Sequence, residues 1–384
     1  MAFQTSFDFR CPTHVIHGSG TISRIPKLIS EELKILVVTD RGLRDAGVVS
    51  RVTDILDESG REYAVFDGVL GNPPARCVHA GYRLYERSGC GAILAIGGGS
   101  PMDVAKMIGV LATNGGRIDL YLGAGKVTEE LPPLICVPTT YGTGSEVTPF
   151  AVLTNPKTNS KDPVISWKTA PQVGILDPDL SVALPASMGA ATGVDALTHS
   201  IESYVSLMAT PISEGIAMSA IELIGDNLRL ACANDHETEA TEAMLIASML
   251  AGVAFSQTRL GNVHAMSHAV GGHFGTHHGL ANAILLPYVM EYNLPTRIDE
   301  FAAIAHALGE DTDGLNPRDA AWLAVDQVRQ LNEDLGIPAK LSDVGVKVSA
   351  IKSMALGAMA SGNVAVNPRK TGQEEFETLF KEAI

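Results

Sequence analysis

The chain has 384 residues, of which 46% are hydrophobic and 18% are charged, and its formal net charge is -15 at pH 7. This composition excludes an intrinsically disordered chain, because such chains are poor in apolar residues, and the length predicts two domains rather than one core. The acidic charge argues against nucleic acid and against an anionic membrane as partners, since both bind cationic surfaces.

The cysteines and the N-terminus indicate the compartment. Cys11, Cys77, Cys90, Cys136 and Cys232 show no C-x-x-C spacing, which favours reduced thiols over a disulfide framework. The first residues lack the basic and then apolar pattern of a signal peptide, and no apolar run is long enough to indicate a transmembrane segment. We therefore expect a soluble, cytoplasmic protein.

From about residue 34, short apolar runs alternate with helical patterns. Strands are expected at 35–38, 63–66, 92–96 and 134–138, and helices at 43–59, 75–89 and 101–113. This alternation predicts a doubly wound α/β domain with a mainly parallel, Rossmann-like sheet. Ligands of such sheets bind beyond the C-terminal ends of the strands, so the residues that follow each strand are candidate binding residues.

The segment GGGSPMDVAK, residues 97–106, follows the third of these strands. Ser100 is expected as the N-cap of the next helix, Pro101 as its first residue and Asp103 as the carboxylate of a capping box. Glycines let a ligand approach the backbone, and free N–H groups at a helix start favour an anion. The segment therefore suggests a phosphate cradle. A plain tight turn stays open, because the run is not a G-x-G-x-x-G fingerprint.

Two other strand ends carry polar residues. Asp40 could accept hydrogen bonds from an adenosine ribose and repel a 2′-phosphate, or it could simply cap a turn. The segment PTTYGTGSE, residues 138–146, is rich in hydroxyl groups and glycine. It is either a second nucleotide-binding loop or a polar surface turn. Two such loops in one sheet favour a nucleotide.

After about residue 185 the strand pattern ends. Helices are expected over 209–231, 238–256, 299–308 and 318–335. We therefore divide the chain into an α/β domain, residues 1–185, and an all-helical domain, residues 186–384.

The helical half contains a candidate metal site. Asp195 and His199 are four residues apart and share one helical face. Residues 261–279 add five histidines, at positions 264, 268, 273, 277 and 278. A single core histidine is common, but imidazoles are poor core fillers unless something engages them, so we expect a divalent metal. Imidazole with one carboxylate suits Fe(II), Zn(II), Mn(II) or Co(II). Spacing alone leaves open which histidines bind.

Four segments together resemble one known family. GGGSPMDVAK, TTYGTGSEVT, ATGVDALTHSIESYV and GNVHAMSHAVGGHFGTHHGLANAILLP are similar, in order and spacing, to the iron-containing, group III alcohol dehydrogenases. The resemblance extends over essentially the whole chain. It implies a dehydroquinate synthase-like architecture, in which a dinucleotide-binding domain precedes a helical metal-binding and substrate domain.

The resemblance also implies roles for residues. The family's metal ligands fall on Asp195, His199, His264 and His278, and His268 becomes a catalytic histidine near nicotinamide and substrate. The NAD contacts fall on Asp40, Asn72, Gly98, Gly99, Ser100, Asp103, Thr139, Thr140, Thr143 and Lys161. The substrate side includes Phe150, Phe255, Arg259 and Asn363. Arg259 departs from the common family pattern, and it could bind an anionic substrate group or pair with a local carboxylate.

The expected activity is reversible hydride transfer between a small primary alcohol and NAD, in a homodimer or larger homo-oligomer. Fe(II) is the expected metal, with Zn(II) as the alternative, and His268 is expected to pass the alcohol proton. Three alternatives stay open. One is a zinc enzyme of the glycerol dehydrogenase or dehydroquinate synthase type. Another is a reductase of a carboxylated, sulfonated or phosphonated aldehyde that uses Arg259. The last is a non-catalytic sensor of metal and nucleotide.

Overall fold

The computed structural model describes residues 6–154, 161–182, 184–233 and 237–384. The chain divides into two compact units: Cys11–Ala183, and Leu184–Ile384 together with the segment that ends at Arg10. Gln257 holds this segment, because its side chain accepts from the backbone N–H of Arg10 and donates to the Arg10 carbonyl. Residues 6–10 therefore belong with the helical unit, although the sequence pattern assigned them to the α/β domain.

A six-stranded sheet forms the centre of the first unit, and every strand pair in it is parallel. Its order is β1 (His14–His17), β9 (Val173–Leu176), β6 (Leu134–Pro138), β4 (Cys90–Gly97), β2 (Lys34–Asp40) and β3 (Tyr63–Val69). The four predicted strands and the Rossmann-like sheet are confirmed. A smaller sheet has the order β5 (Gly123–Ala124), β8 (Lys161–Ile165) and β7 (Phe150–Thr154).

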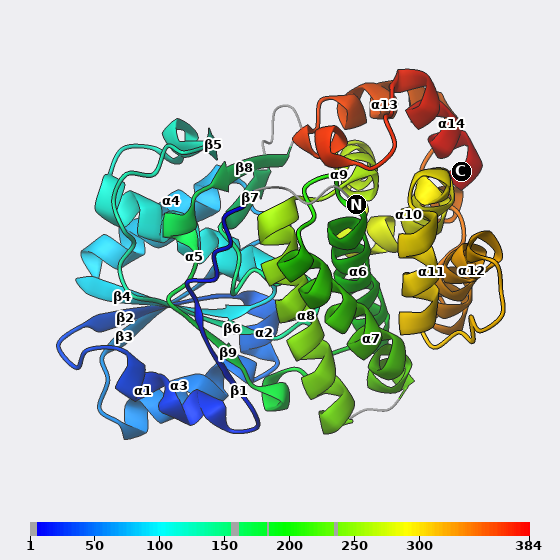
Figure 1. Ribbon diagram of the computed structural model, residues 1–384. Helices are drawn as coiled ribbons and strands as arrows, with labels where there is room; N and C mark the ends of the chain where they lie inside the picture. The colour runs from blue at the N-terminus through cyan, green and yellow to red at the C-terminus, as the bar shows by residue number, and fades with distance from the viewer. Residues whose placement is uncertain (1–5, 155–160, 183, 234–236) are drawn as a thin grey trace. The chain divides into compact units, whose positions relative to one another are not determined.

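Helices cover both faces of the large sheet (Figure 1). In β2, Leu36 and Val38 belong to the core formed with α4 (Ala75–Arg87) and α5 (Gly99–Asn114). The alternate residues Ile35 and Val37 belong to the core formed with α1 (Ile25–Leu28) and α3 (Val48–Glu58). Because both faces are buried, these strands are continuous apolar runs rather than alternating ones.

Two local predictions were wrong. The helix expected over 43–59 is interrupted at Gly47, whose φ of 77° ends α2 (Arg41–Asp45) before α3 begins. The N-cap of α5 is Gly98 rather than Ser100, so Ser100 and Pro101 lie inside the first turn. Asp103 makes no capping box, because its carboxylate accepts from Ser145 Oγ and from the Val152 N–H.

The second unit is helical, as predicted (Figure 1). Its helices are α6 (Ala186–Val205), α7 (Pro211–Ala233), α8 (Thr238–Thr258), α9 (Asn262–Phe274), α10 (His278–Asn293), α11 (Ile298–Ala307), α12 (Pro317–Asp334), α13 (Ile351–Met359) and α14 (Gln373–Ala383). The helices expected over 209–231, 238–256, 299–308 and 318–335 are confirmed. By length and composition α8 could span a membrane, but 61% of its apolar window is buried, and it packs against α6 and α7.

A proline lies inside α10. Pro287 has no N–H, so the carbonyl of Ala283 loses its partner within the helix. The side-chain Nδ2 of Asn332, on α12, donates to that carbonyl at 2.7 Å in a buried position. Helix α12 therefore supplies the hydrogen bond to the Ala283 carbonyl that Pro287 removes from α10.

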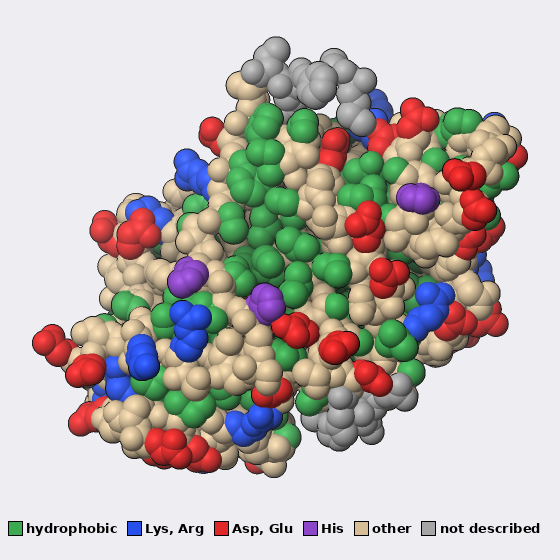
Figure 2. Space-filling view, turned by 60° about the horizontal axis from the view of Figure 1, so that its bottom comes forward, with side chains coloured by type: hydrophobic (Ala, Val, Ile, Leu, Met, Phe, Trp, Pro, Cys, Tyr) green, Lys and Arg blue, Asp and Glu red, His purple; other side chains and the backbone are tan. Residues whose placement is uncertain are grey.

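The surface reflects the acidic composition. Figure 2 shows hydrophobic side chains across the middle of the face that it draws and scattered acidic side chains around them, with lysine and arginine interspersed. This face of the molecule therefore presents no extended cationic surface, in keeping with the net charge of -15.

Candidate functional site

The parallel strands β2, β3, β4 and β6 end at one edge of the sheet, where the two glycine- and hydroxyl-rich loops begin. These loops lie against each other. A Cβ on Gly98 would be 3.2 Å from Thr140 Oγ1, and one on Gly99 would be 3.0 Å from Thr143 Cγ2. The sequence separates the two predicted cradles by about forty residues, and the fold brings them together. A side chain at either position would crowd a threonine of the other loop.

A buried lysine anchors the second of these loops. Lys106 is fully buried on α5, and its Nζ donates to Ser145 Oγ at 3.0 Å, to the Thr148 carbonyl at 2.9 Å and to the Phe150 carbonyl at 2.8 Å. Asp103, one turn earlier, also binds Ser145 Oγ, at 2.9 Å. Burial raises the pKa of Asp103 and lowers the pKa of Lys106, while each charge favours the other. The Asp103 carboxylate and the backbone carbonyl of Phe150 therefore belong to a buried polar network that holds this loop in place.

Other predicted cofactor contacts also gather at this edge. Lys161 Nζ donates to Asn72 Oδ1 at 2.5 Å and to Thr154 Oγ1 at 3.1 Å. Asn72 has a φ of 53°, a conformation that asparagine tolerates better than most residues. Asp40 accepts from the Leu43 N–H at 3.0 Å and so caps α2. The predicted role of Asp40 as a cap is therefore confirmed, and its contact with an adenosine ribose stays a prediction.

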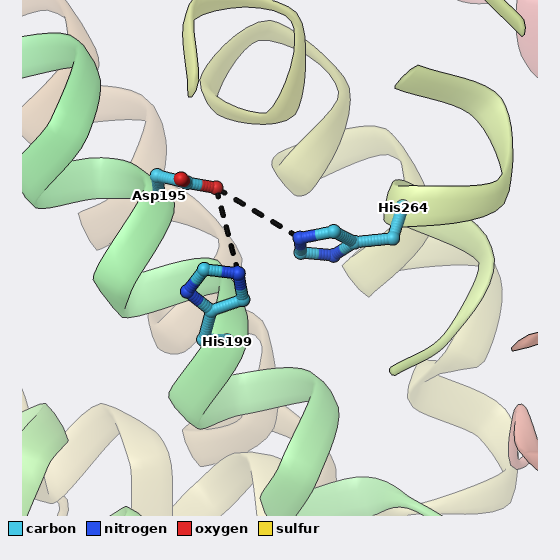
Figure 3. Close-up of side chains that lie close together, drawn as sticks. All are labelled: Asp195, His199 and His264. Carbon is cyan, nitrogen blue, oxygen red and sulfur yellow. Dashed lines mark ion pairs between the residues drawn. The ribbon is translucent and has the colours of Figure 1, made fainter. Parts of the chain in front are cut away.

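Three helices of the helical unit, α6, α9 and α10, bring the predicted metal ligands together. Figure 3 shows three of the four: Asp195 and His199 point from one face of α6 towards His264 of α9. The Nε2 atoms of His199 and His264 each lie 3.8 Å from Asp195 Oδ1. These three side chains are buried, and their ligand atoms all lie within 4.8 Å of one another. His278, the first residue of α10, adds its Nε2 at 4.0 Å from Asp195 Oδ1.

Asn282, one turn along α10 from His278, is a polar residue of this cluster that the sequence did not reveal. Its Nδ2 lies 2.6 Å from Asp195 Oδ1, 3.1 Å from His264 Nε2 and 3.2 Å from His278 Nε2. Among the residues that the structure describes, its buried Oδ1 has no hydrogen-bond partner. Acceptor atoms from three helices thus converge on one small region, which is the chemistry that a divalent cation requires. The residues present fit a metal.

The electrostatics agree with this chemistry. Burial raises the pKa of Asp195, and the His199 imidazole opposes the rise. Burial and then the neighbouring imidazoles hold the pKa of His264 well below 6.5. Metals bind the neutral imidazole through a nitrogen lone pair, so His264 is in the form that a cation needs.

The structure also sorts the remaining histidines and aromatic residues. The ring of His268 stacks on His278, with centroids 5.2 Å apart, so His268 lies beside the ligand cluster. The ring of Phe255 lies 4.6 Å from that of His199. His273 binds the carbonyl of Ala269, and His277 is the N-cap of α10. His264 and His278 thus both lie near Asp195, with His268 beside them, and their role as metal ligands stays a prediction.

Arg259 ends α8 in an unusual backbone conformation, with φ 61° and ψ -174°. Its guanidinium lies against Gly362, where an added Cβ would collide with Nη2. Asn363 follows in the same 3-10 segment, Gly362–Val366. No carboxylate among the described residues forms an ion pair with Arg259, so the predicted pairing with a local carboxylate is not seen in the part of the chain that is described.

Comparisons with known proteins agree with the site. Residues 12–178 match the family model described as iron-containing alcohol dehydrogenase, and residues 189–384 match the C-terminal model of the Fe-containing alcohol dehydrogenase family. The chain is 44% identical to 1,3-propanediol dehydrogenase of Citrobacter freundii, over 98% of both chains. A solved structure of 1,3-propanediol oxidoreductase matches 99% of this chain and 100% of its own, with 43% identity and a TM-score of 0.96. The sulfoacetaldehyde reductase of Bifidobacterium kashiwanohense, solved with NAD+, is 29% identical over 99% of both chains, with a TM-score of 0.88.

Proposed function

The chain belongs to the iron-containing alcohol dehydrogenase family and is an NAD-linked oxidoreductase, and from this premise we propose that it interconverts small primary alcohols and aldehydes. The observation that carries the proposal is the convergence of Asp195, His199, His264 and His278 on one region of the helical unit. Similarity to 1,3-propanediol dehydrogenase supports a short, uncharged substrate.

The metal is held by these same four residues. A divalent cation bound there supplies Lewis acidity, which stabilises negative charge on an alcohol or aldehyde oxygen. Fe(II) is the proposed metal, because the matching family is described as iron-containing, and Zn(II) is the alternative. The buried carboxylate of Asp195 would offset part of the cation's charge, and the three imidazoles would bind through nitrogen lone pairs, which adds no further charge.

His268 is the proposed proton carrier. Its ring stacks on His278, so it lies next to the ligand cluster without being one of the predicted ligands. An unperturbed imidazole titrates near neutral pH, and it can therefore accept the alcohol proton during oxidation and return it during reduction. Phe255, which packs on His199, covers one side of the cluster with an apolar ring.

NAD is bound by the sheet unit in this proposal. The contact between the loops at Gly98 and Thr140 supports a pyrophosphate at the start of α5, where the N–H groups of the first turn favour an anion. Asp40 would disfavour the 2′-phosphate of NADP by charge repulsion. Asn72 and Lys161 lie bonded to each other at the same edge of the sheet.

A second candidate is a reductase of an anionic aldehyde. The exposed guanidinium of Arg259, which has no ion pair with a described carboxylate, and the similarity to sulfoacetaldehyde reductase support it. Arginine binds carboxylate, sulfonate and phosphonate groups through paired hydrogen bonds.

One experiment separates these candidates. The protein is reconstituted with Fe(II) or Zn(II), and NADH absorbance is followed with neutral and anionic aldehydes of equal length. Faster turnover of the neutral series supports the first proposal, and faster turnover of the anionic series, lost in Arg259→Ala, supports the second. A protein that binds metal and NADH but turns over neither series would be a sensor rather than an enzyme.

We further propose a cytoplasmic homodimer or larger homo-oligomer. The free cysteines support a reducing compartment, since Cys77, Cys90 and Cys136 are buried and unpaired as thiols. Light scattering of the purified protein measures the oligomeric state, and a monomer at micromolar concentration would contradict this proposal.

A further inference from the structure

A third polar residue of α6 lies on the same face as two of the metal ligands. Glu202 follows Asp195 by seven residues and His199 by three, and helical periodicity aligns all three. Glu202 is only 5% exposed, and its Oε2 lies 2.6 Å from Nδ1 of His264. The other ring nitrogen of His264, Nε2, faces Asp195 Oδ1 at 3.8 Å. The imidazole of His264 is therefore placed between two carboxyl groups of one helix.

The carboxyl group of Glu202 is itself fixed. Its Oε1 accepts from the Val263 N–H at 2.7 Å, so it also satisfies a backbone donor at the start of α9. Gly261 permits this approach, because a Cβ there would be 2.9 Å from Glu202 Oε1 and 3.0 Å from Asn367 Oδ1. Both oxygens of Glu202 thus have partners on α9, which leaves the carboxyl group little freedom to rotate away from His264.

The groups on both sides of His264 bear on which ring nitrogen carries the proton. Asn282 Nδ2 lies 3.1 Å from His264 Nε2. This amino group can only donate, which agrees with a lone pair on Nε2. The 2.6 Å contact of Nδ1 carries the assignment: an ionised carboxylate can only accept, so an ionised Glu202 places the single N–H of the neutral imidazole on Nδ1.

We propose that Glu202 is a positioning residue of the metal centre, which accepts the Nδ1–H of His264 and so keeps the lone pair of Nε2 directed at the cation. This inference rests on the proposed metal centre. A ligating imidazole that donates its second N–H to a carboxylate is held in one tautomer and one orientation, and loss of such a partner typically weakens metal affinity 10- to 100-fold.

The test is Glu202→Gln, which keeps the size of the side chain. Its carboxamide can still accept from the Val263 N–H, but its NH2 then faces Nδ1 and favours the tautomer with the proton on Nε2. Zn(II) affinity of the apo-protein is measured by competition with a chromophoric chelator, and folding is checked by circular dichroism. We expect Zn(II) affinity to fall about 10- to 100-fold.

Two further variants complete the design. Gly261→Ala leaves Glu202 in place but crowds its carboxylate, and it should weaken Zn(II) binding in the same direction. Thr371→Val removes the hydrogen bond from Asn262 Nδ2 at the same helix start without touching Glu202, and it should bind Zn(II) as tightly as the wild type. If Glu202→Gln does not fold, the Zn(II) affinities of Gly261→Ala and Thr371→Val are compared instead. Weaker binding in Gly261→Ala alone supports the role of Glu202, and equal binding in the two variants contradicts it.

The outcomes separate this inference from the proposed function. Wild-type Zn(II) affinity in folded Glu202→Gln would overturn the role of Glu202 alone, provided that His264→Ala abolishes binding. Equal weakening in Glu202→Gln and Thr371→Val would show that Glu202 acts only through the start of α9. A wild-type protein that binds no metal would instead overturn the proposed metal centre.

Discussion

A Cβ atom on Gly279 would lie 2.6 Å from the carbonyl oxygen of Ala191, closer than a side-chain carbon approaches backbone. The same Cβ would be 3.4 Å from the Cβ of Asp195. Helices α6 and α10 therefore cross in contact at Gly279, next to His278. This contact explains how Asp195 and His278, on different helices, reach the same region.

Gly279→Ala should force α6 and α10 apart, because the obstacle is backbone rather than a movable side chain. Overpacking of this kind costs about 1–3 kcal/mol, and the displacement of His278 should also weaken metal binding. Thermal unfolding and Zn(II) titration measure the two effects. Gly271→Ala is the control, since its Cβ would meet only the Thr276 carbonyl, at 3.6 Å. An unchanged Zn(II) affinity in Gly279→Ala would contradict this account of the helix contact.

Replacement of His264 or His278 by alanine should abolish metal retention and turnover. NADH affinity should stay close to that of the wild type, because the predicted NAD contacts are in the other unit. Metal analysis, steady-state rates and NADH fluorescence titration measure these three quantities. His273→Ala is the matched control, since His273 binds a backbone carbonyl of its own helix. A His264→Ala variant that stays active without metal would contradict the assignment.

Asp40→Asn should raise kcat/KM for NADP relative to NAD, because it removes the negative charge that repels a 2′-phosphate. The asparagine can still cap α2 through its oxygen, so stability should change little. Asp40→Ala should alter coenzyme preference in the same way but also lose about 1 kcal/mol of stability with the cap. If neither variant shifts the NADP to NAD ratio, Asp40 is only a turn cap.

Glu146 should make the stability of the sheet unit depend on pH. It is 2% exposed, and burial raises its pKa from 4.5 to about 7. Below pH 4.5 the group is protonated in both the folded and unfolded states. As pH rises from 4.5 to about 7, the unfolded state loses its proton first, so the folded state loses stability on the order of 3 kcal/mol.

The measurement compares Glu146→Gln with the wild type in urea unfolding. A Trp322→Phe background leaves Trp167 as the fluorescent reporter within the sheet unit. The variant should be increasingly more stable than the wild type as pH rises from 4.5 to about 7, and the difference should be constant above that range. A difference that does not change with pH would mean that burial does not shift the pKa of Glu146 between the unfolded and folded states.

The sequence predicted the central strands because each is a buried apolar run, as in Ala92-Ile93-Leu94-Ala95-Ile96. It did not predict β1 or β9, since four residues carry too little pattern. The capping box predicted for Asp103 was wrong because its carboxylate binds Ser145 and Val152, which are distant in sequence. Local patterns therefore predict elements well and predict their ends less well.

The metal ligands were predictable in part. The i, i+4 spacing of Asp195 and His199 and the density of histidines indicated a site, and the resemblance to a known family selected among the histidines. Glu202 and Asn282 were missed, although each continues a helical stripe: Glu202 three residues beyond His199, and Asn282 four residues beyond His278. Extending each ligand stripe by one turn would have found both.

The hydrogen bond from Asn332 to the Ala283 carbonyl has a consequence for the chain as a whole. α12 contributes no residue to the ligand cluster, yet a shortened protein without it would leave a bare carbonyl in the middle of the helix that begins with His278. We therefore expect α12 and α10 to unfold together, so that their slowest-exchanging amides report a common opening event in hydrogen exchange.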